Sequence, residues 1–311
     1  AIGAGSPEEI VFTSGGTEAD NLALSGIPGN LAVSAVEHPA VLEPAKHRGA
    51  TVLPVSPEGR LDPESVPEGL ALLSVMLVNN EVGTLQPVAE LAREGRLLHT
   101  DAVQAVGKIP VDVRALGVDL LTLSAHKVQG PQGVGALYVR KGTVLNPQTL
   151  GGGQEAGLRS GTENVAGIVG FGAALEAASK RMEKDMFRVQ GLRDRLQARI
   201  LKALPDVRVN GSLLFRAPHI LSISVDGVDA EAVLMRLDEE GISASSGSAC
   251  ASEAGTPSHV MTAMGVTGAL AKGTLRFSLG RGNTTAEIDQ TAQVLARVVS
   301  DLRALAPARA G

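Results

Sequence analysis

The sequence is poor in aromatic residues and in cysteine. Its 311 residues include five Phe, one Tyr, no Trp and a single cysteine, Cys250. One cysteine cannot form an internal disulfide, and it excludes a cysteine-rich metal site. Cys250 is therefore either an inert buried side chain or a residue with a special role.

Long apolar runs and an excess of positive charge are also missing. The longest apolar run, 70–78, contains one Ser and is far shorter than the ~20 residues that span a bilayer. Lys and Arg number 28 against 33 Asp and Glu, a net charge of −5, so neither a nucleic-acid nor a membrane partner is expected. The amino end lacks the basic and apolar regions of a signal peptide, so we expect a cytoplasmic protein.

The first two-thirds of the chain alternates short apolar runs with amphipathic stretches. We expect strands at 10–12, 31–33, 52–55, 70–78, 97–100, 120–124 and 135–139, and helices at 16–24, 41–47 and 88–94. Such interleaving predicts a mostly parallel sheet covered by helices on both faces. Ligands of these sheets bind beyond the carboxyl ends of the strands, where the polar residues gather in this sequence.

Longer helices and then a smaller α+β pattern follow. We expect a helix at 165–178, a charged break at 180–184, and a second helix whose apolar residues recur every three or four positions up to Leu204. Further on, Asp229 is placed to cap a helix, and residues 284–287 form a capping box. We therefore predict a large α/β domain over 1–181 and a smaller α+β domain over 182–311.

The segment 13–18 (TSGGTE) lies where an expected strand turns into a helix. Backbone N–H groups of a Gly-rich turn, backed by a helix N-terminus, form an anion site, and Thr17 adds a hydroxyl donor. An ordinary helix cap is the alternative. A Walker loop is excluded, because no Gly-Lys-Ser/Thr sequence follows.

Lys127 follows the expected strand 120–124, and Asp101 ends another strand. A lysine at such a strand end is well placed to form a Schiff base, although a surface lysine is the alternative. Pyridoxal phosphate needs an imine lysine, a carboxylate for its ring nitrogen, a phosphate cradle and a donor near its ring oxygen. The sequence supplies that set as Lys127, Asp101, Gly16 with Thr17, and Gln104. A metal site built from His99, Asp101 and His126 is a weaker interpretation.

Several other residues are candidates with two interpretations each. The adjacent amides Asn79 and Asn80 end a buried run and are costly there unless they bind something. His38 is either a structural histidine or one that stacks on a ring or moves a proton. Arg276 can grip a carboxylate or form an ion pair. Cys250, among small and hydroxylic residues, is a candidate nucleophile rather than a core residue.

Taken together, these segments resemble the cysteine desulfurases of the NifS/IscS type, within the class V aminotransferase superfamily. The resemblance runs nearly end to end and rests on FTSGGTEADN (12–21), EH (37–38), NNEVG (79–83), HTDAVQ (99–104), SAHK (124–127), RSGTEN (159–164), GSAC (247–250), PSHV (257–260) and LRFS (275–278). Each motif is weak alone, and their order makes the set specific. Family members usually carry a further segment before the position of Ala1.

The resemblance implies a fold type I pyridoxal 5'-phosphate enzyme that works as a homodimer. It implies that Lys127 holds the cofactor and moves protons, that Asp101 keeps the ring nitrogen protonated, and that His38 stacks on the ring. It further assigns Gln104 to the ring hydroxyl, Gly16, Thr17, Ser124 and His126 to the phosphate, Thr162 to the partner subunit's phosphate, and Asn80 and Arg276 to the substrate. Asn80 also counts among the expected cofactor contacts.

The resemblance also implies a reaction. Cys250 takes the sulfur of L-cysteine as a persulfide, L-alanine is released, and the sulfur passes to an acceptor such as an iron–sulfur scaffold or a tRNA-thiolation protein. It implies no resident metal, only a transient iron–sulfur contact through Cys250. The alternatives are another class V enzyme, a selenocysteine lyase or aminotransferase, and a non-catalytic sulfur-relay module.

Overall fold

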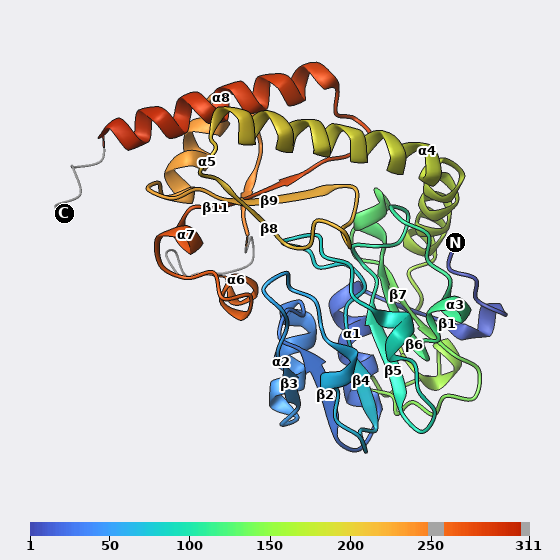
Figure 1. The fold of residues 1–311 in the computed structure, drawn as a ribbon. Coiled ribbons are helices and arrows are strands. Elements are labelled where there is room, and N and C mark those ends of the chain that lie inside the picture. Colours follow the sequence, from blue (N-terminus) through green and yellow to red (C-terminus); the bar gives the residue numbers. More distant parts are fainter. Residues whose placement is uncertain (248–257, 306–311) are drawn as a thin grey trace. The chain divides into compact units, whose positions relative to one another are not determined.

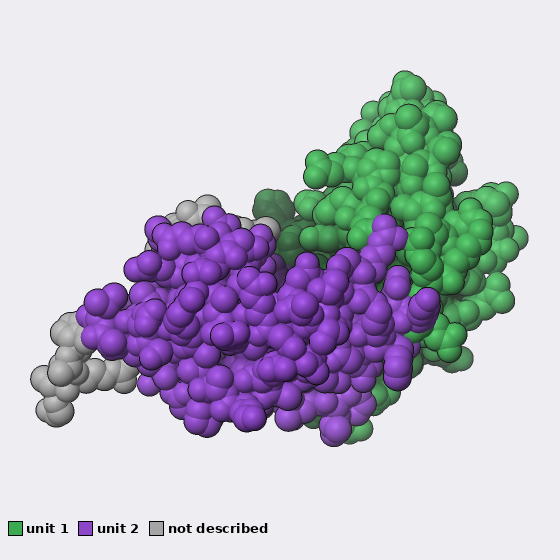
Figure 2. Space-filling model, turned by 90° about the horizontal axis from the view of Figure 1, so that it is seen from above, with its two compact units in different colours: residues 1–56, 60–79, 85–183 green, residues 57–59, 80–84, 184–311 purple. Residues whose placement is uncertain are grey.

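A computed structural model describes residues 1–247 and 258–305 of the chain (Figure 1). The chain forms two compact units, coloured separately in Figure 2. Unit 1 comprises residues 1–56, 60–79 and 85–183, and unit 2 comprises residues 57–59, 80–84 and 184–311. Two short segments from the first third of the sequence, one of them 80–84, thus belong to unit 2.

Unit 1 is built on a seven-stranded sheet in the order β1-β7-β6-β5-β4-β2-β3. The strands are β1 Ile10–Thr13, β2 Leu31–Ser34, β3 Thr51–Leu53, β4 Leu72–Ser74, β5 Leu97–Asp101, β6 Leu120–Ser124 and β7 Gly135–Val139. Strands β3, β2, β4, β5 and β6 pair in parallel, and β7 pairs antiparallel with both β6 and β1. The mostly parallel sheet expected from the sequence is confirmed.

Helices cover the sheet of unit 1. They are α1 Gly16–Gly26, α2 Pro39–His47, α3 Val113–Leu116 and the first part of α4 Val165–Ala203, with short 3-10 helices at Pro7–Glu9, Pro63–Ser65, Val88–Leu91, Ala125–Val128 and Glu155–Gly157. Helix α1 packs against β5, β6 and β7, and α2 packs against α1. Apolar side chains of α1, such as Leu22, are buried with strand residues such as Val33 and Leu120 in one core. That burial fixes the start of α1 beside the strand ends.

Unit 2 has its own sheet and core. The strands β8 Arg208–Asn210, β9 Ile220–Ser224, β10 Ser245–Ser246 and β11 Thr274–Ser278 pair antiparallel in the order β10-β11-β9-β8. The helices are the end of α4, α5 Ala230–Glu239, α6 His259–Ala263, α7 Gly268–Lys272 and α8 Thr285–Leu305. The expected cap is present, because Asp229 accepts a hydrogen bond from the Glu231 N–H at 2.8 Å. The capping box also forms between Thr284 and Glu287.

Three local predictions were wrong. The charged residues at 180–184 do not break the helix, because α4 is continuous from Val165 to Ala203. Lys, Arg, Met and Glu are good helix formers, and Lys180 pairs with Glu176 one turn earlier at 2.5 Å. The expected helix 88–94 is a 3-10 turn that ends at Leu91, since Ala92 is extended.

The expected strand 70–78 also differs from the structure. Only Leu72–Ser74 is a regular strand, although residues 72–79 are all buried. Beyond β4, the N–H groups of Val75 and Leu77 still donate to carbonyls of β5, at 3.1 and 2.9 Å. In residues 1–247 and 258–305, no helix combines the length and the apolar character needed to cross a membrane.

Gly135 provides a test of how tightly the Gly-rich turn after β1 is packed. A Cβ atom on Gly135 would lie 2.6–2.7 Å from backbone atoms of Gly15 and from the Leu123 carbonyl oxygen. Because these neighbours are backbone, they cannot move aside cheaply. We expect Gly135→Ala to lower the free energy of unfolding by roughly 2–3 kcal/mol in urea denaturation.

Gly191→Ala is the matched control. Gly191 is exposed in α4, and a Cβ there meets nothing within 4 Å. Because Ala favours the helix over Gly, this variant should gain about 0.5–1 kcal/mol. Equal unfolding midpoints for the two variants would contradict the close approach at Gly135.

Candidate active site

The first turn of α1 meets the ends of two strands. A Cβ on Gly16 would lie 3.0 Å from a methyl group of Val103 and 3.6 Å from the Ser124 Cβ. Gly16 therefore lies beside the end of β6 and the segment that follows β5. The Thr13 hydroxyl donates to the Gly15 carbonyl at 2.9 Å, and Gly15 itself faces open space. The Thr17 side chain is exposed, so the helix N-terminus is accessible to an anion.

The Glu18 carboxylate holds the turn after β1 in place. Glu18 accepts the Ser14 N–H at 2.7 Å and forms an ion pair with Arg159 at 2.7 Å. Arg159 lies in the segment 159–164, so the ion pair joins that segment to α1. These hydrogen bonds outweigh the cost of burying part of Glu18, and its pKa is lowered. In the sequence, Arg159 is only the first residue of the motif RSGTEN, which by itself indicates no partner for its side chain.

Asp101 ends β5 and is buried. Its carboxyl accepts the Val103 N–H at 2.8 Å. Burial raises the pKa of Asp101 to about 6, although the Val103 hydrogen bond and the positive charges of Lys127 and Lys108 oppose the rise. A buried carboxyl that faces ammonium groups is suited to hold a positively charged ring nitrogen.

Several basic residues lie near Asp101 at this end of the sheet. Lys127 is exposed in the 3-10 turn Ala125–Val128, directly after β6. The Ser124 hydroxyl contacts the His126 ring at 2.9 Å. Burial lowers the pKa of His126, and the charges of Lys127 and Lys108 lower it further. This mutual repulsion among basic groups would be relieved by an anion.

Lys108 is a residue that sequence reasoning missed. It donates to the backbone carbonyl and the side chain of Gln104, both at 3.4 Å. Burial lowers the pKa of Lys108 to about 8, with a further lowering from Lys127 and an opposing effect of Asp101. The sequence feature that could have indicated a role for Lys108 is its position four residues after Gln104, in the same short segment as Asp101.

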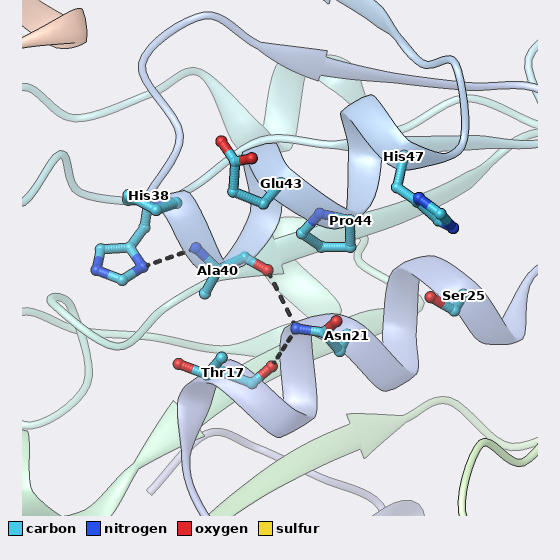
Figure 3. A pocket seen from close by; sticks show the side chains of 9 residues that line it. Thr17, Asn21, Ser25, His38, Ala40, Glu43, Pro44 and His47 are labelled. Atoms are coloured by element: carbon cyan, nitrogen blue, oxygen red, sulfur yellow. Dashed lines mark hydrogen bonds between the residues drawn. The ribbon is translucent and has the colours of Figure 1, made fainter.

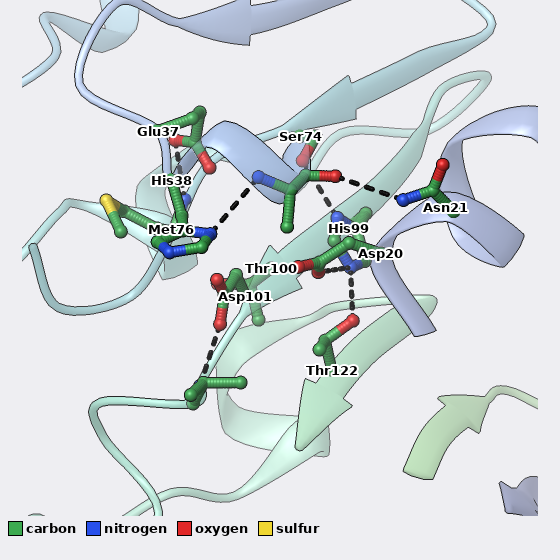
Figure 4. Close-up of polar contacts among 12 residues, drawn as sticks. Asp20, Asn21, Glu37, His38, Ser74, Met76, His99, Thr100, Asp101 and Thr122 are labelled. Atoms are coloured by element: carbon green, nitrogen blue, oxygen red, sulfur yellow. Dashed lines mark hydrogen bonds and ion pairs between the residues drawn. The ribbon is translucent and has the colours of Figure 1, made fainter. Parts of the chain in front are cut away.

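A buried polar layer lies beneath these residues (Figure 4). The His99 ring contacts the Ser74 hydroxyl at 2.8 Å and the Thr122 hydroxyl at 3.0 Å, and its Nε2 lies 3.7 Å from an Asp20 carboxyl oxygen. Burial lowers the pKa of His99 to about 3, so its ring is neutral near pH 7, and burial raises the pKa of Asp20 above its ordinary value.

This geometry leaves the metal interpretation without support. His99 and Asp101 lie two residues apart on one face of β5, but both ring nitrogens of His99 contact hydroxyls. Among the residues that the structure describes, no three His, Cys, Asp or Glu side chains are grouped as metal ligands.

Glu37 is a second buried acid that sequence reasoning did not single out. Its carboxyl accepts the Ser34 hydroxyl at 2.5 Å and the Met76 N–H at 2.8 Å. Burial raises the pKa of Glu37 to about 8, and these two hydrogen bonds oppose the rise. Because Glu37 precedes His38 directly, these bonds fix the backbone that carries the histidine.

His38 caps α2 and lies in a groove with Thr17 (Figure 3). Its Nδ1 accepts the Ala40 N–H at 3.1 Å, so a neutral ring carries its proton on Nε2. Asn21 donates to the Thr17 carbonyl at 2.8 Å and to the Ala40 carbonyl at 3.5 Å, and thereby joins α1 to α2. The structure thus places His38 and Thr17 in one groove.

The expected substrate residues belong to unit 2. The Arg276 guanidinium, on β11, donates to the Asn80 carbonyl at 2.8 Å, so these two residues are brought together. Thr162 is exposed in unit 1. Cys250 lies outside the described residues.

Comparisons with known proteins agree with this arrangement. The family model described as "Aminotransferase class-V" matches residues 1–291. A cysteine desulfurase of Cereibacter sphaeroides is 49% identical over 98% of this chain and 84% of its own length. Cysteine desulfurase IscS of Dictyoglomus turgidum is 45% identical over 99% of this chain and 83% of its own length.

Two solved structures extend the comparison. A NifS-like protein superposes with a TM-score of 0.86 at 36% identity, over 95% of this chain and 84% of that one. SspA in complex with cysteine has a TM-score of 0.72 at 33% identity, over 90% of this chain and 83% of that one.

Glu37→Gln should change how stability depends on pH. Unfolded Glu37 loses its proton near pH 4.3, whereas folded Glu37 keeps it to about pH 8. The folded state therefore binds more protons in this window, and its stability falls as pH rises. Relative to Glu37→Gln, the wild type should lose a few kcal/mol between pH 5 and 8 and level off above.

The measurement is urea denaturation of both proteins at several pH values. Contributions of His99, Asp20 and Asp101 are common to both proteins and largely cancel in the difference. A difference that stays flat from pH 5 to 8 would mean that Glu37 is ionised in the fold.

Proposed function

Because the chain belongs to the class V aminotransferase family, we propose that it is a cysteine desulfurase, which converts L-cysteine to L-alanine. The structural observation that carries the proposal is the meeting of Asp101, Lys127 and the α1 N-terminus at one end of the sheet. The identity of 42–49% to proteins named cysteine desulfurase, over nearly the whole chain, supports the same reaction.

The residues present fit pyridoxal 5'-phosphate, the cofactor that the family uses. Asp101 supplies a buried carboxyl, and Lys127 and Lys108 place positive charge near it, while His126 offers a ring nitrogen. Gly16, Thr17 and Ser124 offer backbone and hydroxyl donors for a phosphate at the start of α1. When bound, the cofactor supplies an electron sink next to the amino-acid carbon.

Each residue of the site has a separate task in this proposal. Lys127 would hold the cofactor through Nζ and would accept and return a proton. Asp101 would keep a proton on the ring nitrogen, Gln104 would contact the ring hydroxyl, and His38 would pack against the ring. Asn80 and Arg276 orient the substrate carboxylate. Thr162 is exposed, as a residue that reaches the phosphate of a second subunit must be.

Cys250 carries the sulfur. Its thiolate forms a bond to the sulfur of L-cysteine, the carbon–sulfur bond breaks, and the carbon gains a proton to give L-alanine. The enzyme keeps a persulfide, so the atoms balance without an external oxidant. Because the chain has no second cysteine, no internal thiol can resolve the persulfide. The sulfur therefore passes to an acceptor protein, for which an iron–sulfur scaffold is our proposal, in the cytoplasm.

Cys250→Ala tests the role of the thiol. The variant should keep the visible absorbance of the bound cofactor and its change on adding L-cysteine, because neither needs the thiol. Persulfide formation and alanine release should fall at least 100-fold. Unchanged sulfide release would exclude the assigned role of Cys250 and favour a lyase or aminotransferase reaction.

Lys127→Ala tests the cofactor site. The variant should lose the absorbance that a lysine–cofactor bond produces after incubation with pyridoxal phosphate. Lys141→Ala, which removes another exposed lysine, is the control and should keep it. A wild type that stays colourless would instead favour a non-catalytic sulfur-relay module.

A further inference from the structure

Glu81 is a buried acid in unit 2 to which the proposed function gives no task. It follows Asn80 directly, in the segment 80–84, and its side chain is 2% exposed. A carboxyl at this depth is costly unless other groups compensate it. Its partners therefore indicate what it does.

One carboxyl oxygen of Glu81 lies close to two residues, Ser258 and Gly247, that are distant from Glu81 in the sequence. Oε2 accepts the Ser258 hydroxyl at 2.5 Å. The same oxygen would lie 2.8 Å from a Cβ on Gly247, so it occupies the space that a side chain at this position would need. A side chain at 247 would push the carboxyl away from this position.

Both contact residues are held by further bonds. The Ser258 oxygen also caps α6, where it accepts the Val260 N–H at 3.0 Å. Gly247 is buried, and its carbonyl lies 3.5 Å from the Arg276 guanidinium, which also binds the Asn80 carbonyl. Burial raises the pKa of Glu81, and the Ser258 hydrogen bond, His259 and Arg276 oppose that rise.

Gly247 and Ser258 are the residues on either side of the segment 248–257, which contains Cys250. We propose that Glu81 is a positioning residue, which fixes both ends of the cysteine-bearing segment through Ser258 and Gly247. Glu81 then determines how efficiently Cys250 meets the substrate sulfur, without touching substrate itself. This inference rests on the proposed function of Cys250.

The test uses holoenzyme carrying Glu81→Gln or Ser258→Ala. In single-turnover reactions with L-cysteine, persulfide formation on Cys250 should slow by about tenfold or more in each variant. The absorbance change that L-cysteine induces when it binds should stay within twofold of wild type. Since Cys250 is the only cysteine, alkylation by iodoacetamide reports on this thiol alone and should also stay within twofold.

Matched variants separate positioning from a merely structural effect. Ser258→Thr keeps the hydroxyl and should restore persulfide formation. Thr262→Ala removes a neighbouring hydroxyl of α6, exposed and bonded to the Ser258 carbonyl, and should leave it unchanged. If Glu81→Gln does not fold, Gly247→Ala, which displaces the same carboxyl, takes its place.

The outcomes are distinct. Wild-type rates of persulfide formation in Glu81→Gln and Ser258→Ala would overturn the positioning role while leaving desulfuration intact. An equal loss of substrate binding and persulfide formation would also overturn it, because that pattern indicates general damage. A wild type that forms no persulfide would refute the proposed function itself.

Discussion

The neutral imidazole of His99 joins several elements at the centre of unit 1. His99 on β5 bonds Ser74 of β4 and Thr122 of β6, and Asp20 of α1 lies against the same ring. Three strands and the helix that begins at Gly16 are thus joined at one buried point. Asp101 lies two residues further along β5, on the same face. A shift of β5 against its neighbours would therefore move the carboxyl and the helix N-terminus together.

The charges near this point are separated into two layers. Asp20 and Glu37 lie within the protein, and burial raises the pKa of both, to about 8 for Glu37. Lys127, Lys108 and His126 lie at the open end of the sheet. Asp101 stands between the two layers, and burial raises its pKa to about 6. Lys127 and Lys108 place positive charge near Asp101, which suits a bound phosphate.

Much of the fold and of the site could be predicted from the sequence. Apolar runs ended by polar motifs placed Asp101 and Ser124 at strand ends, and the Gly-rich turn placed Gly16 at a helix start. The continuous helix α4 was missed, because a run of charges resembles a loop although every residue in it favours a helix. Buried acids such as Glu37 were missed for a different reason. Their partners, such as the Met76 N–H, lie far away in the sequence, and local patterns carry no information about them.

Glu81 shows what such distant contacts add to the chemistry. The consecutive residues Asn80 and Glu81 contact Arg276 through a carbonyl and Ser258 through a carboxyl, respectively. The segment 80–84 therefore contacts both Arg276, which is expected to bind the substrate carboxylate, and Ser258, which directly follows the segment 248–257 that contains Cys250. A change in backbone position at 80–84 would alter both at once. In a chain with a single cysteine, no second thiol can compensate for a misplaced one, so under the proposed function the precision of these anchors would limit the transfer of sulfur.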